Sequence, residues 1–205
     1  MPTPAPSPVP VPTPAPAPSP VDLPPATALR QNPVSDGDAC AGCAYFVESS
    51  FVYVVGSLTG QVKFATPLST NVGRAWLSLN RLGGTADAHA VSVFGVGSDS
   101  VQLAIGELRA GSLLGELQIP AGLSAGQEVF LDVTDFVRST PAAYLSFNLY
   151  STGAVDLFSS LEINEGLPSQ LILSAVPEPS EAALMFAGLL TLAGWLRRRA
   201  FKAPA

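Results

Sequence analysis

The chain has 205 residues, of which 47% are apolar and only 13% are charged, and its formal net charge is −6. This length allows one domain with extensions, and the low charged fraction argues against a highly charged, disordered chain. The acidic balance argues against nucleic acid as a partner, because phosphate binding needs clustered Lys and Arg. The single histidine, His89, excludes most sites built from several imidazoles.

Prolines are concentrated at the start of the chain. Twelve of the 20 prolines lie within residues 1–25, and every second residue from Pro2 to Pro20 is proline. Because proline fixes φ and removes the amide donor, this pattern predicts an extended polyproline II segment. We expect residues 1–34 to form a disordered, Pro-rich spacer.

Residues 35–175 carry short apolar stretches separated by turn residues, which is typical of β structure. Alternation is clearest in residues 143–150, where Leu145, Phe147 and Leu149 share one face. Nine further segments are expected as strands: 51–55, 61–64, 75–79, 90–94, 101–107, 113–119, 128–131, 155–158 and 170–174. A short helix is expected at 134–138, with Asp132 or Thr134 as its cap. Short strands without intervening long helices predict an all-β domain, an antiparallel β-sandwich or jelly roll.

The last part of the chain, residues 176–205, has three sections in a fixed order. A Pro-rich breaker at 176–180 precedes an uncharged apolar stretch at 182–196, and a basic cluster follows at 197–199. We expect 182–196 to be a single hydrophobic helix of about 22 Å, short of the ~30 Å bilayer core. The arginines should remain cytoplasmic, which leaves the large domain outside. A buried C-terminal helix is the alternative, and the arginine cluster argues against it.

These three sections together resemble the PEP-CTERM sorting tail of exported bacterial proteins. The resemblance implies that Pro177, Glu178 and Pro179 are the tripeptide recognised by an exosortase, a membrane processing enzyme that removes the tail. It also implies a cytoplasmic stop, made of Arg197, Arg198 and Arg199. The expected path is export, transient anchoring in the inner membrane by the C-terminal helix, and release to the cell surface or the extracellular matrix.

The β domain is similar to DNRLRE-type domains, which are jelly-roll modules related to carbohydrate-binding modules. The residues that carry this resemblance lie in four segments: 131–137, 143–147, 158–162 and 167–171. The resemblance implies a jelly roll attached to an exported protein, with extracellular polysaccharide as a candidate ligand.

Cys40 and Cys43 form a Cys-x-x-Cys pair before the strand expected at 51–55. A zinc site needs four ligands, and only His89 could add a third. Ala44 in place of histidine excludes c-type haem attachment, and a thioredoxin-like role would need a βαβ setting. We therefore expect a small-loop disulfide, formed in an oxidising compartment.

Candidates for chemistry are few. No nucleophile motif accompanies His89, so we expect no catalytic residues and no enzymatic activity. Two acidic pairs are weak candidates for calcium, Asp36 with Asp38 and Asp132 with Asp135. Aspartate is also common in turns and caps, so we expect no metal and no other cofactor apart from this calcium candidate.

Three aromatic residues are expected on outward faces of strands. Alternation turns Trp76 away from its apolar neighbours, and it turns Tyr144 and Tyr150 away from theirs. Exposed aromatic rings suit the C–H faces of sugars, although Trp76 could instead pack under a loop or a second sheet. We expect a non-catalytic, exported surface or matrix protein whose jelly roll binds polysaccharide. The alternatives are a structural or protein-binding matrix protein, and a glycan hydrolase.

Overall fold

The computed structural model describes residues 23–40, 51–56, 58–68, 71–108, 110–161, 167–176 and 184–192. From residue 29 to residue 175, the described part forms eleven strands and two short helices. In chain order these are β1 (Leu29–Gln31), β2 (Ser35–Cys40), β3 (Phe51–Val55), β4 (Leu58–Ala65), β5 (Val72–Gly84), β6 (His89–Ser98), α1 (Ile105–Leu108), β7 (Ser112–Ile119), β8 (Gln127–Asp132), α2 (Thr134–Ser139), β9 (Tyr144–Tyr150), β10 (Val155–Ser159) and β11 (Gln170–Ala175).

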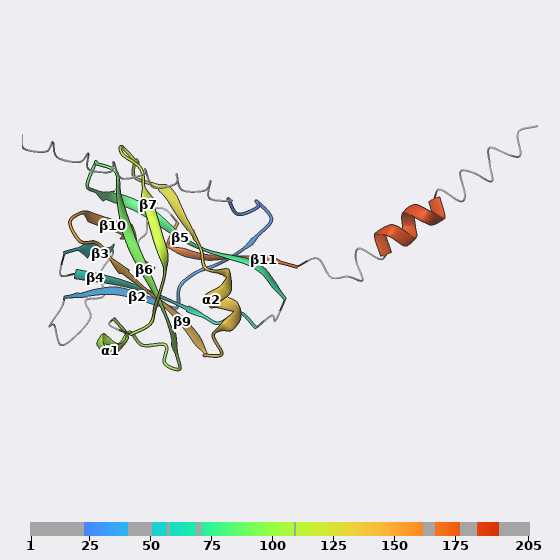
Figure 1. Ribbon diagram of the computed structural model, residues 1–205, viewed down its shortest axis with the longest axis horizontal. Coiled ribbons are helices and arrows are strands. Elements are labelled where there is room, and N and C mark those ends of the chain that lie inside the picture. The colour runs from blue at the N-terminus through green and yellow to red at the C-terminus, as the bar shows by residue number, and fades with distance from the viewer. Residues whose placement is uncertain are drawn as a thin grey trace, which may run out of the picture.

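Every strand pair is antiparallel, and the sheet curls over on itself into two layers (Figure 1). One layer has the order β2–β4–β9–β6–β7. The other is built on the long strand β5, which pairs with β11 and β10 along one edge and with β8 along the other. The predicted all-β fold, an antiparallel sandwich of the jelly-roll type, is confirmed.

The core lies between the two layers and follows the period-2 alternation of the strands. Leu145, Phe147 and Leu149 of β9 are fully buried, as predicted, and Phe147 packs edge-on against Phe64 and Phe136 at 5.8 and 5.4 Å between ring centroids. Burial of such aromatic and aliphatic side chains is the main driving force for a fold of this kind.

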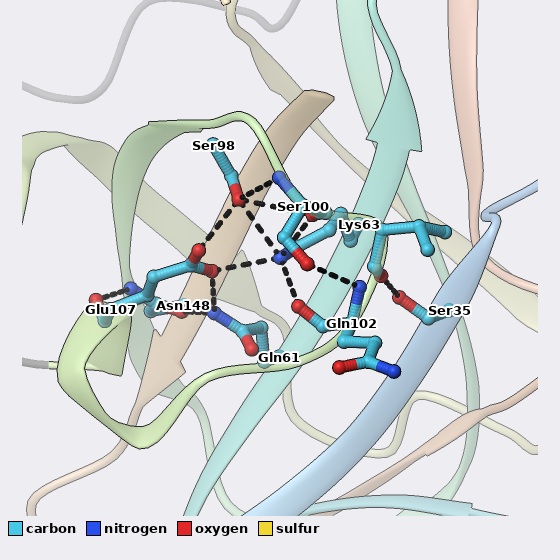
Figure 2. A network of polar contacts seen from close by, with 9 residues as sticks. Ser35, Gln61, Lys63, Ser98, Ser100, Gln102, Glu107 and Asn148 are labelled. Carbon is cyan, nitrogen blue, oxygen red and sulfur yellow. Dashed lines mark hydrogen bonds and ion pairs between the residues drawn. The ribbon is translucent and has the colours of Figure 1, made fainter. Parts of the chain in front are cut away.

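One expected strand is wrong. Residues 101–107 do not form a strand: the chain crosses the outer face of β4 and β9 and forms α1. The physical reason is Lys63 on β4, whose fully buried ammonium group binds the carbonyl oxygens of Ser100 and Gln102 at 3.0 and 2.6 Å (Figure 2). The alternating sequence of this segment therefore reflects a covering loop rather than a strand.

Other elements refine the expected boundaries. The acidic, Gly-containing β2 was not expected, whereas α2 begins at Thr134 as predicted and the Asp132 carboxylate accepts its N–H at 2.9 Å. β1 lies inside the segment 1–34 for which a spacer is predicted, so the ordered β domain begins at or before Leu29.

Residues 184–192 form a helix, drawn in red in Figure 1. Its large apolar side chains are all more than half exposed: Leu184, Met185, Phe186, Leu189, Leu190 and Leu192. Within the described residues, no helix has both the length and the apolar character needed to cross a membrane. The expected recognition tripeptide Pro177–Pro179 and the arginine cluster 197–199 lie outside the described residues.

Candidate functional site

Trp76 occupies the face of β5 that the sequence predicted, but it is not accessible. Its side chain points away from the core residues Leu77 and Leu79, yet only 1% of the residue is exposed. The Arg74 guanidinium lies 4.9 Å from the centre of the indole ring, and Ile172, its neighbour on β11, is buried beside it. The expectation that Trp76 offers an open stacking surface is therefore wrong, because the outer face of β5 is covered.

The two tyrosines lie on the other layer, at opposite ends of β9. At about 3.3 Å per residue, the seven residues of this strand place Tyr144 and Tyr150 roughly 20 Å apart. Both are half-buried, and Tyr150 packs edge-on against Phe94 of β6 at 5.3 Å. The structure thus does not bring the three predicted stacking residues into one surface.

A different aromatic residue lies in an open position on β8. Alternation along Gln127–Asp132 turns Glu128, Phe130 and Asp132 to the outer face, where Asp132 is the cross-strand neighbour of Trp76. Phe130 is half-buried between the two carboxylates. Sequence reasoning identified this strand but missed the outward row, although the same alternation rule would have found it.

Both carboxylates of this row are held in place by arginines from other strands. Arg30 of β1 reaches Glu128 at 2.6 Å, and Arg74 of β5 reaches Asp132 at 2.7 Å. The Arg30–Glu128 pair bridges strands that are not adjacent, because β11 and β5 lie between β1 and β8, whereas the Arg74–Asp132 pair joins the adjacent strands β5 and β8. These contacts fix the orientation of the carboxylate oxygens on the outer face.

Two hollows run beside β8. The first, of about 460 Å³, is lined by the outward row of β8 and by Glu116 and Gln118 of β7. The second, of about 540 Å³, shares Arg74 and Asp132 with the first and continues to α2. Each falls within the range of roughly 300–1,000 Å³ that small-molecule sites occupy. We call the two hollows together the β8 groove, lined by Arg74, Glu116, Gln118, Glu128, Phe130 and Asp132.

The groove exists because β8 is paired along one edge only. β8 pairs with β5, and β7 pairs with β6, but β7 and β8 do not pair with each other in the described part of the chain. The sandwich is therefore open between these two strands, and polar side chains from both line the opening.

The electrostatics of the groove favour an ionised carboxylate at Asp132. Partial burial raises the pKa of Asp132, but hydrogen bonds from Thr134 and Arg74 outweigh it, so the pKa lies below its usual value. At the other end of the outward row, the hydrogen bond to Glu128 raises the pKa of Arg30 despite the opposing effect of burial. At Asp132 the groove thus offers a fixed hydrogen-bond acceptor.

His89 is tied into a buried polar cluster. Its Nε2 lies 2.6 Å from the fully buried Asp156 carboxylate, and its Nδ1 lies 2.7 Å from the carbonyl oxygen of Asp87. Arg81 contacts the second oxygen of Asp156 at 3.0 Å. Since both ring nitrogens already face oxygen atoms, neither is placed to act on a substrate in this arrangement.

The calcium candidates do not converge. Asp36 and Asp38 are buried on β2, where the Asp36 carboxylate accepts the N–H of Leu161 at 2.7 Å. Asp132 binds Arg74 and Thr134, and Asp135 is exposed in the first turn of α2. Among the residues that the structure describes, no three His, Cys, Asp or Glu side chains are grouped to hold a metal ion.

The predicted disulfide falls outside what the structure describes. The backbone of Cys40 ends β2, whereas its side chain and the whole of Cys43 are not described.

Comparison with known proteins places the chain in no family: no family model and no curated protein matches it. Two solved structures of an exo-beta-1,3-galactanase from Phanerochaete chrysosporium, both with beta-1,3-galactotriose, are similar to it at 12% identity. The first covers 73% of this chain and 30% of the galactanase, with a TM-score of 0.38. The second covers 74% and 28%, with a TM-score of 0.34. The chain therefore spans less than a third of the length of these structures.

Proposed function

We propose that this protein is a non-catalytic, exported surface or matrix protein that binds polysaccharide in the β8 groove. The observation that carries the proposal is the outward row of Glu128, Phe130 and Asp132 beside an open hollow of about 460 Å³. The groove takes the place of the combined surface of Trp76, Tyr144 and Tyr150 that the sequence suggested. Of these three residues only Trp76 also lines the groove, with 1% of the residue exposed.

The residues of the row match the two surfaces of a sugar ring. The half-buried ring of Phe130 offers a flat apolar surface for the C–H face of a pyranose. Glu128 and Asp132 on either side offer carboxylate oxygens that accept hydrogen bonds from hydroxyl groups. Because arginines already hold both carboxylates, little side-chain freedom is lost when a ligand binds.

For the two carboxylates of the outward row, the same geometry supports binding rather than hydrolysis. Most glycosidases use two carboxyl groups, one of which must keep a raised pKa to protonate the leaving group. The pKa of Asp132 is instead lowered, and Glu128 forms an ion pair with Arg30. The matrix-protein alternative remains a second outcome of the binding experiment below.

The binding experiment compares the two aromatic faces of the sandwich. The full chain is tested by co-sedimentation with insoluble polysaccharides and by calorimetry with their soluble oligomers. We expect Phe130→Ala to abolish binding, because stacking of the sugar ring depends on this side chain, whereas Tyr150→Ala on the other layer leaves binding unchanged. Circular dichroism checks that both variants are folded.

The opposite result, binding lost with Tyr150→Ala and kept with Phe130→Ala, would move the site to the face of β9 and β6. Binding to none of the polysaccharides, with a folded wild type, would favour the structural or protein-binding role.

Export and sorting form the second half of the proposal. The tail order of Pro177–Pro179, apolar stretch and Arg197–Arg199 suits an exosortase substrate. The exposed apolar side chains of helix 184–192 support a segment that is buried in another medium rather than in the β domain. Pulse-chase labelling in the native cells should show loss of a C-terminal fragment, and Glu178→Gln should retain the uncut form. Mature protein that still carries residues 184–192 would refute the sorting proposal.

A further inference from the structure

We infer that the preferred ligand of the β8 groove is an amine-bearing glycan, a polymer of deacetylated amino sugars. The inference rests on the proposed function, because it specifies the ligand of the same groove. It is carried by the balance of charged groups that line the two hollows, together with the Phe130 ring of the outward row, which offers an apolar surface for a sugar ring.

The arginines of the groove are already engaged. Arg74 is paired with Asp132, and Arg30 is paired with Glu128. Arg138, at the far end of the second hollow, donates to the backbone carbonyls of Val72 and Gly73. Each of these guanidinium groups thus already has a hydrogen-bond partner, and two of the three form ion pairs with carboxylates of the outward row.

Two carboxylates that line the groove have no such partner among the described residues, Glu116 in the first hollow and Asp135 in the second. Glu116 is exposed on β7 and faces the first hollow opposite the row on β8. No ion pair within the described part of the chain includes it. Gln118, two residues further along the same face of β7, adds an amide oxygen. A ligand with ammonium groups meets acceptors here, and a uronic acid polymer meets a like charge.

The protein shows elsewhere which groups satisfy an ammonium ion. The Nζ atom of Lys63 is surrounded by a carboxylate oxygen, a hydroxyl and two carbonyl oxygens at 2.6–3.2 Å (Figure 2). An ammonium group donates three hydrogen bonds and accepts none. Glu116 and Gln118 supply acceptors of the same kinds to a sugar amine in the open groove.

The net negative charge of the whole domain also favours an amine-bearing ligand. Residues 36–175 contain thirteen acidic and five basic side chains. The negative electrostatic field of this excess attracts polycations and repels polyanions at low salt. It is screened within about 8 Å at physiological ionic strength. The short-range contribution of Glu116 should therefore be separable from the general field by mutation.

The test uses three hexasaccharides that differ mainly in charge: N-acetylglucosamine, glucosamine and a uronic acid. Calorimetry is performed with the full chain, at a pH at which the glucosamine amine is protonated and at low and high salt. We expect the amine-bearing hexamer to bind at least threefold more tightly than the neutral one, and the uronic acid hexamer to bind most weakly. The differences should shrink at high salt.

Two charge-removing variants locate the effect. Glu116→Gln should lower the preference for the amine-bearing hexamer by about two- to fivefold, the range expected for one exposed ion pair, with neutral binding unchanged. Asp99→Asn removes one exposed carboxylate about 20 Å from Glu116 along β6, at roughly 3.3 Å per residue, and should leave the preference unchanged.

The outcomes separate this inference from the proposed function. Binding of the neutral hexamer without preference for the amine-bearing one would overturn the inference and leave the proposed function standing. Equal effects of Glu116→Gln and Asp99→Asn would also overturn it, because the general field alone would then explain the preference. Binding of none of the three hexamers would overturn the proposed function itself.

Discussion

Substitution of Lys63, whose ammonium group is fully buried, is the strongest single test of how this fold is stabilised. The ammonium group lies 2.9 Å from the Glu107 carboxylate and also contacts Ser98 and the carbonyls of Ser100 and Gln102. These contacts bind the loop between β6 and β7 to the outer face of β4. We predict that Lys63→Met, which keeps the apolar stem and removes the charge, releases this loop and destabilises the domain.

The magnitude follows from what remains after the charge is removed. Breaking a buried ion pair by deleting one partner costs about 3–5 kcal/mol. Glu107 is partly exposed and keeps donors from Ser98 at 2.6 Å and Gln61 at 3.3 Å, so we expect the lower end, about 3 kcal/mol. Lys63→Met combined with Glu107→Gln should recover about 1–2 kcal/mol, because no unpaired charge is left.

Urea denaturation measures these differences. With a slope of roughly 1–3 kcal/mol per molar urea, a loss of about 3 kcal/mol lowers the midpoint by roughly 1–3 M. Hydrogen exchange should show faster exchange at residues 99–108. Arg74→Met, which removes an exposed pair with Asp132, should cost no more than about 1 kcal/mol. A double variant no more stable than Lys63→Met, or a loss below about 1 kcal/mol for Lys63→Met itself, would refute the reasoning.

Three further predictions concern other parts of the domain. Arg81→Leu leaves the buried carboxylate of Asp156 with one charged partner fewer and should cost about 3–5 kcal/mol in urea denaturation. The folded-state pKa of Asp132 lies below its usual value, so its contribution is complete above the unfolded-state pKa and is lost as the pH falls through the folded-state pKa. The stability difference between wild type and Asp132→Asn should therefore close on acidification, as urea midpoints at a series of pH values will show. Gly60→Ala places a methyl group 2.4 Å from a valine side chain of β3 and should cost about 1–3 kcal/mol, whereas Gly153→Ala meets no atom within 4 Å and should be nearly neutral.

The fold class could be predicted because alternation is a local property of a strand. The inward positions of β9 follow directly from their period of two, and they lie in the core as expected. What covers the opposite face is decided by distant parts of the chain. Ser146 and Asn148 face outward, yet both are fully buried, and the carbonyl of Glu107 in α1 accepts a hydrogen bond from Asn148 at 2.7 Å.

The dependence on distant parts of the chain also explains why the segment 101–107 is not the expected strand. Its apolar and polar residues alternate as in a strand, and no local rule distinguishes a strand from a loop packed over a polar face. The deciding partner is Lys63, which lies some forty residues earlier in the chain. Lys63 lies on the polar face of β4 with Thr59 and Gln61, and once that face is covered its ammonium group needs oxygen acceptors from the covering segment.

Accessibility of the outward aromatic residues follows from the position of their strand in the sheet. Trp76 and Phe130 are both directed to the outer face, on the neighbouring strands β5 and β8. β5 has partners along both edges, so side chains from either side close over Trp76. β8 has a partner along one edge only in the described chain, so Phe130 is covered from one side and keeps an open flank beside β7. In a sandwich of this kind, an outward aromatic ring is most useful for binding on the strand that borders the opening, and the sequence alone does not say which strand that is.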